Sequence, residues 1–134
     1  MPKMIFLNLP VRDLAASAAF FEALGGTVNA QFSTDSNTSI MLSDTIIVMI
    51  MTHERFATFT ARPIGDPRTQ AQALIALNVD SRADVDATVD KLVAAGGRAD
   101  PNPSQDHGFM YGRSVEDPDG YVWELFWMDP AAVA

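Results

Sequence analysis

The sequence predicts an α+β protein built from two tandem copies of one βαβββ unit. The apolar stretch FLNLPV (6–11) resembles LIALNV (74–79), and both are typical of buried strands. Each is followed by a helical pattern that ends in Gly-Gly, within ALGG in the first half and AAGG in the second. Further strand-like stretches follow each helix. Similarity of this kind between halves predicts that each half folds as the same supersecondary unit.

The first predicted unit covers residues 1–52. A strand at 5–11 precedes Asp13, a residue type that caps helix N-termini, and the predicted helix LAASAAFFEAL (14–24) ends at Gly25-Gly26. Three more strands are expected, and polar clusters separate them: 27–33, 38–43 and 45–51.

Residues 53–72 interrupt this order, because two prolines and a glycine break any periodicity. Only a short helical turn at 54–59 is expected there. The segment is therefore interpreted as a connection between the units within a single domain, 1–134.

The second predicted unit covers residues 73–128. It begins with a strand at 73–79, followed by a helix that Ser81 caps and that is about three residues longer than the first. RADPNPS (98–104) is expected to be irregular. The remaining strands, GFMYGRSV and YVWELFWM, are joined by DPDG (117–120), which suits a type I turn.

Composition excludes several classes of protein. The chain has nine basic and seventeen acidic residues, for a net charge of −8, and no basic patch, which argues against nucleic-acid binding. The absence of cysteine excludes disulfides and zinc–thiolate sites. No apolar run reaches the roughly 18 residues of a membrane span, and the N-terminus does not resemble a signal peptide. A cytoplasmic protein is expected.

Glu124 is the first candidate functional residue. It is the only ionisable side chain in YVWELFWM, where it shares one face of the predicted strand with Val122, Phe126 and Met128. Burying a carboxylate on an apolar face costs free energy unless it is paired or protonated, so such a residue suggests a functional role. Three roles are open to Glu124: a structural hydrogen-bonding group with a partner such as Arg113, a ligand-orienting group, or a general base.

Other polar residues are candidates for the same site. His107, in a loop before a strand, could act as an acid, a base or a hydrogen-bond donor, and Tyr111 could bind a substrate carbonyl. Arg113 could bind an anion, and Asn8 could orient a ligand. Each residue also has a structural alternative: His107 bonded to nearby backbone, Tyr111 half-buried, and Asn8 bonded to a neighbouring strand.

Three stretches carry a resemblance to a known family: LPVRDLAASAAFFEALGG (9–26), LIALNVDSRADVD (74–86) and YGRSVEDPDGYVWEL (111–125). With the repeat, they resemble the vicinal oxygen chelate superfamily, which includes glyoxalase I, bleomycin-resistance proteins and extradiol dioxygenases. The most similar branch is that of predicted lactoylglutathione lyase-related proteins. The resemblance implies that two βαβββ modules form a cupped mixed sheet, the glyoxalase-type fold, in a homodimer.

The resemblance also implies a metal site in metal-dependent members, with ligands on the first and last strands of each module. The matching positions hold Phe6 and Leu74 on the first strands and only Glu124 on a last strand, since 45–51 contains no ligand type beyond methionine sulfur. A metal cofactor is therefore not expected. If a divalent metal binds, Glu124 and His107 are the expected ligands.

Two classes of function remain. The first is a binding protein that holds a small, partly apolar molecule in the sheet cavity, with Phe6, Asn8, Met49, Leu74, Arg113 and Phe126 as ligand-binding candidates. The alternative is an enzyme resembling glyoxalase or a dioxygenase, acting on a small carbonyl or aromatic compound. In that case the catalytic candidates are Glu124 as base and His107 or Tyr111 as donor. The sequence favours the binding protein.

Overall fold

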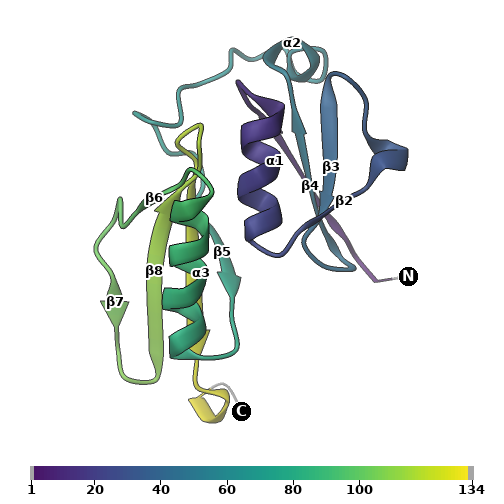
Figure 1. Ribbon diagram of the computed structural model, residues 1–134. Helices are drawn as coiled ribbons and strands as arrows, with labels where there is room; N and C mark the ends of the chain where they lie inside the picture. The colour runs from purple at the N-terminus through teal and green to yellow at the C-terminus, as the bar shows by residue number, and fades with distance from the viewer. Residues whose placement is uncertain (1, 133–134) are drawn as a thin grey trace. The chain divides into compact units, whose positions relative to one another are not determined.

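The computed structural model describes residues 2–132 and consists of two compact units, Met1–Asp66 and Pro67–Ala134. The boundary falls inside the segment that the sequence predicts to be a connection. Each unit contains one mixed sheet with one long helix against it (Figure 1). The predicted α+β class and the βαβββ order of the units are confirmed. In the described part of the chain, no helix is both long and apolar enough to span a membrane.

Unit 1 follows the predicted order of elements. Its elements are β1 (Ile5–Pro10), α1 (Leu14–Ala23), β2 (Thr27–Val28), β3 (Asn37–Met41), β4 (Ile46–Met51) and the short helix α2 (His53–Phe56). The strand order is β1-β4-β3-β2, with β1 parallel to β4 and the other neighbours antiparallel. The core includes Phe20, Phe21, Ile40, Val48 and Ile50, all fully buried.

Unit 2 repeats this arrangement with a longer helix. Its elements are β5 (Ile75–Asn78), α3 (Arg82–Ala94), β6 (Arg98–Ala99), β7 (Gln105–Asp106), β8 (Met110–Glu116) and β9 (Val122–Met128). The strand order is β5-β9-β8-β6, in which β5 is parallel to β9, as β1 is to β4. α3 has 13 residues and α1 has 10, which is the expected difference.

The caps explain where the two long helices begin and end. The Asp13 carboxylate accepts a hydrogen bond from the backbone N of Ala16, and the Ser81 hydroxyl accepts one from that of Asp84, both at 3.0 Å. After each helix, the first glycine of the Gly-Gly pair has a positive φ, 105° at Gly25 and 104° at Gly96. Both helices therefore start and stop where the sequence predicts.

Two predictions of local structure are wrong. The expected strand at 27–33 is reduced to Thr27–Val28, because the Asn29 side chain accepts a hydrogen bond from Gln31 N and starts a short 3-10 helix, Ala30–Phe32. The stretch expected to be irregular at 98–104 begins with β6, and β7 follows it directly. Both are two-residue strands that add to the long strand β8, so their own sequences carry little periodicity.

Candidate functional site

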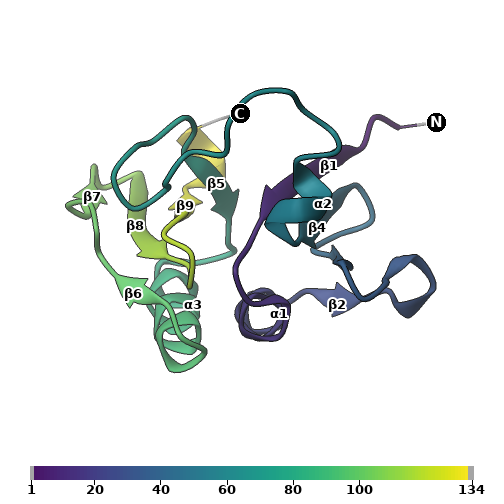
Figure 2. The same ribbon diagram turned by 90° about the horizontal axis from the view of Figure 1, so that it is seen from above.

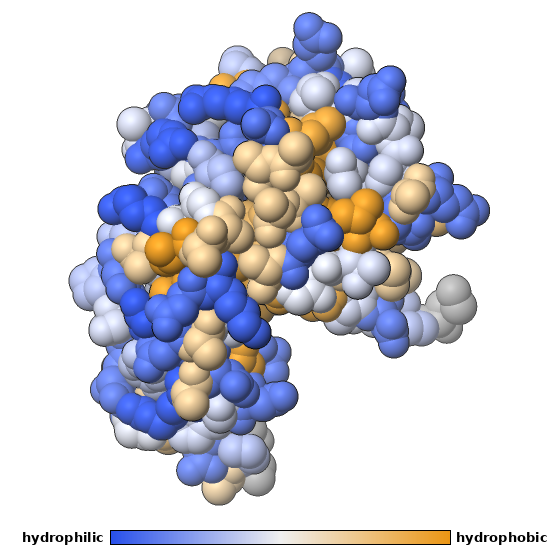
Figure 3. Space-filling model, viewed as in Figure 1, coloured by the Kyte–Doolittle hydropathy of each residue, from blue (hydrophilic) through white to orange (hydrophobic). Residues whose placement is uncertain are grey.

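The two faces of the unit 2 sheet differ in chemistry. α3 packs against β8 and β9 on one side (Figure 2), where Trp123 and Leu125 are buried together with Val85, Val89 and Leu92 of the helix. The exposed side of α3 is mostly hydrophilic (Figure 3). Because side chains alternate along a strand, Glu124, Phe126 and Met128 of β9 lie on the opposite face of the sheet. The alternation predicted for this strand is confirmed.

A cavity of about 300 Å³ lies on the face that carries Glu124. The strands contribute its floor, and the segment around β7 contributes a wall. Its lining consists of Ala76, Pro103, Gln105, Met110, Gly112, Arg113, Ser114, Glu124, Phe126 and Met128. Most of these side chains are apolar, so the cavity suits a small molecule with an apolar body.

Glu124 occupies the middle of a cross-strand row in this cavity. Its neighbours in register are Ala76 on β5 and Ser114 on β8. The carboxylate is half-buried, and no side chain or backbone group among residues 2–132 forms a hydrogen bond or ion pair with it. The Ser114 hydroxyl is already used, since it donates to the O of Asn102 at 3.3 Å and accepts from the backbone N of the same residue at 3.1 Å. Glu124 is thus the unpaired acceptor of the cavity.

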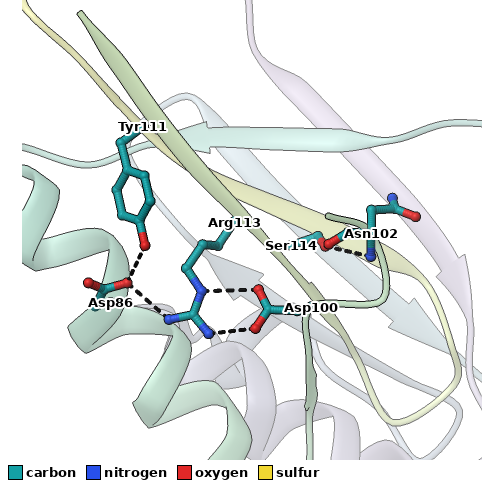
Figure 4. A network of polar contacts seen from close by, with 6 residues as sticks. All are labelled: Asp86, Asp100, Asn102, Tyr111, Arg113 and Ser114. Carbon is teal, nitrogen blue, oxygen red and sulfur yellow. Dashed lines mark hydrogen bonds and ion pairs between the residues drawn. The ribbon is translucent and has the colours of Figure 1, made fainter. Parts of the chain in front are cut away.

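Arg113 does not pair with Glu124. Although it borders the cavity, its guanidinium lies with two carboxylates at α3 and after β6 (Figure 4). It binds Asp100 through two bonds, of 3.0 Å from Nε and 2.7 Å from Nη2, and Asp86 through one of 3.0 Å from Nη1. The structure therefore does not support the possible structural pair between Glu124 and Arg113.

Tyr111 belongs to the same polar network. Its hydroxyl donates to Asp86 Oδ1 at 2.7 Å, and this bond raises the pKa of Tyr111. Hydrogen bonds from Tyr111 and then Arg113 lower the pKa of Asp86, and those from Arg113 lower that of Asp100. The hydrogen bonds to Asp100, and then the one to Asp86, raise the pKa of Arg113. The phenol is therefore on the side of the sheet opposite Glu124, with its proton already engaged.

The network also holds the wall of the cavity. Asp100 has a φ of 56°, uncommon for a residue other than glycine, and it starts the segment that carries Pro103 and Gln105. Arg113 holds this segment near its start, and an ion pair between Arg82 and Asp106 holds it at its other end. Asp86, Asp100, Arg82 and Asp106 are structural residues that sequence reasoning did not identify.

We expect Arg113→Met to loosen this wall. Losing three hydrogen bonds with exposed carboxylates should lower the free energy of unfolding by about 1–2 kcal/mol, measured by urea denaturation at pH 7. Because the folded-state pKa values of Asp86 and Asp100 are lowered, their contribution is complete above pH 4 and is lost as the pH falls below it. The difference from wild type should shrink there.

Hydrogen exchange gives an independent readout for Arg113→Met. Amides of residues 100–106 should exchange faster in this variant. Arg98→Met is the matched control, because it removes another ion-paired arginine of unit 2, the partner of Glu116. Equal exchange in wild type and Arg113→Met would contradict the role given to the network.

His107 does not reach the cavity lining. It is exposed after β7, where its Nε2 lies 3.4 Å from Gln105 Oε1 and its ring stacks on Phe109. The backbone N of His107 bonds to the O of Met110 at 2.8 Å. The structure therefore does not bring His107 and Glu124 together in this cavity.

The remaining candidates divide between the units. Phe126 lines the cavity, whereas Leu74 is 52% exposed and Phe6, in unit 1, is 59% exposed. Asn8 is exposed on β1 in register with Met49, and the Met49 sulfur accepts from the Asn37 amide at 3.1 Å.

The two sheets contain matching rows of residues across their strands. The row Asn8–Met49–Ser39 in unit 1 occupies the same place as the row Ala76–Glu124–Ser114 in unit 2. Met49 is therefore the counterpart of Glu124 in unit 1.

Comparison with known proteins supports the assignment that the repeat and the site suggest. A profile of the glyoxalase/bleomycin resistance protein/dioxygenase superfamily matches residues 3–125. The chain belongs to this superfamily. No curated protein matches the chain at a significant level.

Solved structures of the glyoxalase superfamily and related proteins share the fold. A hypothetical protein from S. aureus is 27% identical, with a TM-score of 0.78 and 95% of each chain covered. A glyoxalase/bleomycin resistance protein/dioxygenase family enzyme from Burkholderia phytofirmans is 20% identical, with a TM-score of 0.76 and coverage of 95% of this chain and 99% of that one. TnmS3, an antibiotic-binding protein from Streptomyces, is 18% identical, with a TM-score of 0.65 and coverage of 96% and 97%.

The residues of this glyoxalase superfamily member do not fit the divalent metal that the family resemblance implies. Phe6 and Leu74 have hydrocarbon side chains, and Met49, the counterpart of Glu124, offers only a thioether. Hard divalent ions require several oxygen or nitrogen ligands. Within residues 2–132, no group of three or more histidine, aspartate or glutamate side chains is placed to hold an ion.

Several cavity residues were not predicted from the sequence. Met128 could have been found, because it shares the face of Glu124 by simple alternation, and Met110 lies opposite it on β8. Ala76 follows from the register of β5 with β9. Pro103 and Gln105 gave no usable signal, since they lie in and directly after the segment expected to be irregular.

Proposed function

We propose that unit 2 binds a small, partly apolar molecule in the cavity beside Glu124, without a metal ion held by the usual four ligands. The observation that carries this proposal is the lining, in which the flexible side chains of Met110 and Met128 and the ring of Phe126 share one cavity with an unpaired carboxylate. Methionine adapts to ligands of different shape, and a few polar groups among apolar ones fix orientation. The volume of about 300 Å³ is at the lower end for small-molecule sites.

The same geometry favours binding over turnover. A glyoxalase-like reaction with Glu124 as base would need a donor that polarises the substrate carbonyl. Tyr111 already donates its proton to Asp86 on the helix side of the sheet, and His107 lies outside the cavity lining. Neither catalytic candidate is placed to assist Glu124 in this cavity.

Methyl NMR of protein labelled at its seven methionines tests the proposal. Titration with phenethyl alcohol, a neutral compound with an aromatic body, should shift the Met110 and Met128 resonances, which Met→Leu variants assign. Met51, 2% exposed in unit 1, serves as an internal control. Addition of Mn²⁺ should not broaden the two cavity resonances. Unshifted resonances at millimolar ligand would contradict binding here, and selective Mn²⁺ broadening would contradict the absence of a metal site.

A further inference from the structure

We infer that the ligand of this cavity carries a positive charge, as an alkylammonium or arylalkylammonium group does, and that Glu124 is its counter-ion. This inference rests on the proposed function and specifies the class of ligand. Glu124 is the acidic residue of the lining, and no described residue forms a hydrogen bond or ion pair with its carboxyl group. An ionised carboxylate only accepts hydrogen bonds, so the partner it lacks must be a donor.

Among the described residues, the cavity lining offers Glu124 no basic side chain on its own face of the sheet. Arg113 contributes to the lining, but its side chain lies on the helix face, where the guanidinium makes three hydrogen bonds to Asp86 and Asp100. Those two carboxylates more than neutralise the guanidinium. Glu124 is therefore left as the uncompensated charge of the cavity, a condition that favours a cationic ligand and disfavours an anionic one.

The other groups of the cavity fit an amphipathic cation. Phe126 can contact the charged group through its ring face, and the sulfurs of Met110 and Met128 are soft, polarisable contacts for an apolar body. Gln105 also lines the cavity, and its amide oxygen, although 3.4 Å from His107 Nε2, has a second lone pair that can accept from an ammonium group. The net charge of −8 on the chain favours the approach of cations at low salt.

Three compounds with similar bodies and different head groups test the inference: phenethylammonium, phenethyl alcohol and phenylacetate. Affinities are measured by the same Met110 and Met128 methyl shifts at low salt. We expect phenethylammonium to bind about tenfold more tightly than the alcohol, which corresponds to one close charge pair, and phenylacetate to bind most weakly. Added salt should reduce the preference for the cation.

The variant Glu124→Gln distinguishes the contribution of the carboxylate charge to binding from the contribution of the cavity's shape. In this variant the preference for phenethylammonium should disappear, while the affinity for the alcohol remains within about twofold. Asp90→Asn is the matched control, because it removes one negative charge from an exposed position on α3. This control should keep the preference for the cation.

The outcomes distinguish the inference from the proposed function. If the alcohol binds and the cation has no advantage, or keeps its advantage in Glu124→Gln, the inference is wrong and the binding function stands. If phenylacetate binds most tightly, the inference is likewise wrong. If none of the three compounds shifts the cavity methyls, the proposed function fails, and the inference fails with it.

Discussion

Asp117→Ala is expected to reduce the free energy of unfolding by about 2–4 kcal/mol at pH 5, measured by urea denaturation. Asp117 is 4% exposed at the start of the turn between β8 and β9. Its Oδ1 accepts from the backbone N of Asp119, Gly120 and Tyr121, each at 3.0 Å. Its Oδ2 accepts from the indole N of Trp123 at 3.2 Å. Alanine would remove the carboxylate that accepts all four of these hydrogen bonds at a buried position.

Asp117→Asn should lose less stability than Asp117→Ala. The amide oxygen of asparagine can still accept from the three backbone N–H groups, so the turn is kept. Its NH₂ group, however, would face the indole N–H of Trp123, and two donors cannot bond to each other. Equal losses in the two variants would show that the bond to Trp123, and not the turn, is the main contribution.

The pH dependence of Asp117 has a definite sign. Burial raises the pKa of Asp117 to about 6, although hydrogen bonds from Trp123 and the backbone act in the opposite direction. A folded-state pKa above the unfolded value means that the folded protein binds more protons between pH 4 and 6. The stability advantage of wild type over Asp117→Asn should therefore fall as the pH rises through this range, by up to about 3 kcal/mol. A rising advantage would show that the four donors outweigh burial.

The fold was largely predictable because its signals are local and repeated. Asp13 and Ser81 cap their helices, the glycine pairs end them, and a hydrogen bond from Gly120 N to Asp117 O closes the predicted DPDG turn. Strand β2 was predicted too long, and strands β6 and β7 were not predicted. Each has only two residues, which is too short to show a periodic pattern in the sequence. Their position depends on the edges of longer strands, which is information from the tertiary structure.

The residues of the candidate site were predictable only where the alternation of side chains along a single strand determines which face of the sheet they occupy. Glu124 and Phe126 share a face because β9 is regular for seven residues. Tyr111 and Arg113 lie on the other face of the sheet because their register partners on β9 are Trp127 and Leu125. Sequence alone does not give this register. The partners of Arg113 come from α3 and from the segment after β6, 27 and 13 residues away in sequence, so no local pattern could have named them.

Ala76→Trp is expected to abolish binding of phenethyl alcohol and phenethylammonium alike, with a loss of at least about 100-fold. Ala76 is in register with Glu124, and its small side chain leaves the cavity open next to the carboxylate. An indole at this position would occupy much of a space of about 300 Å³. Because Ala76 is an exposed residue of the edge strand β5, the fold should tolerate the change, and unfolding by urea checks this.

Ala87→Trp is the matched control for this prediction, since it places the same side chain on an exposed position of α3, on the other side of the sheet. Both compounds should bind to it as to wild type. Whereas Glu124→Gln removes a charge and keeps the space, Ala76→Trp removes the space and keeps the charge. A folded Ala76→Trp protein that still binds both compounds at wild-type affinity would place the ligand elsewhere than beside Glu124, whatever its charge.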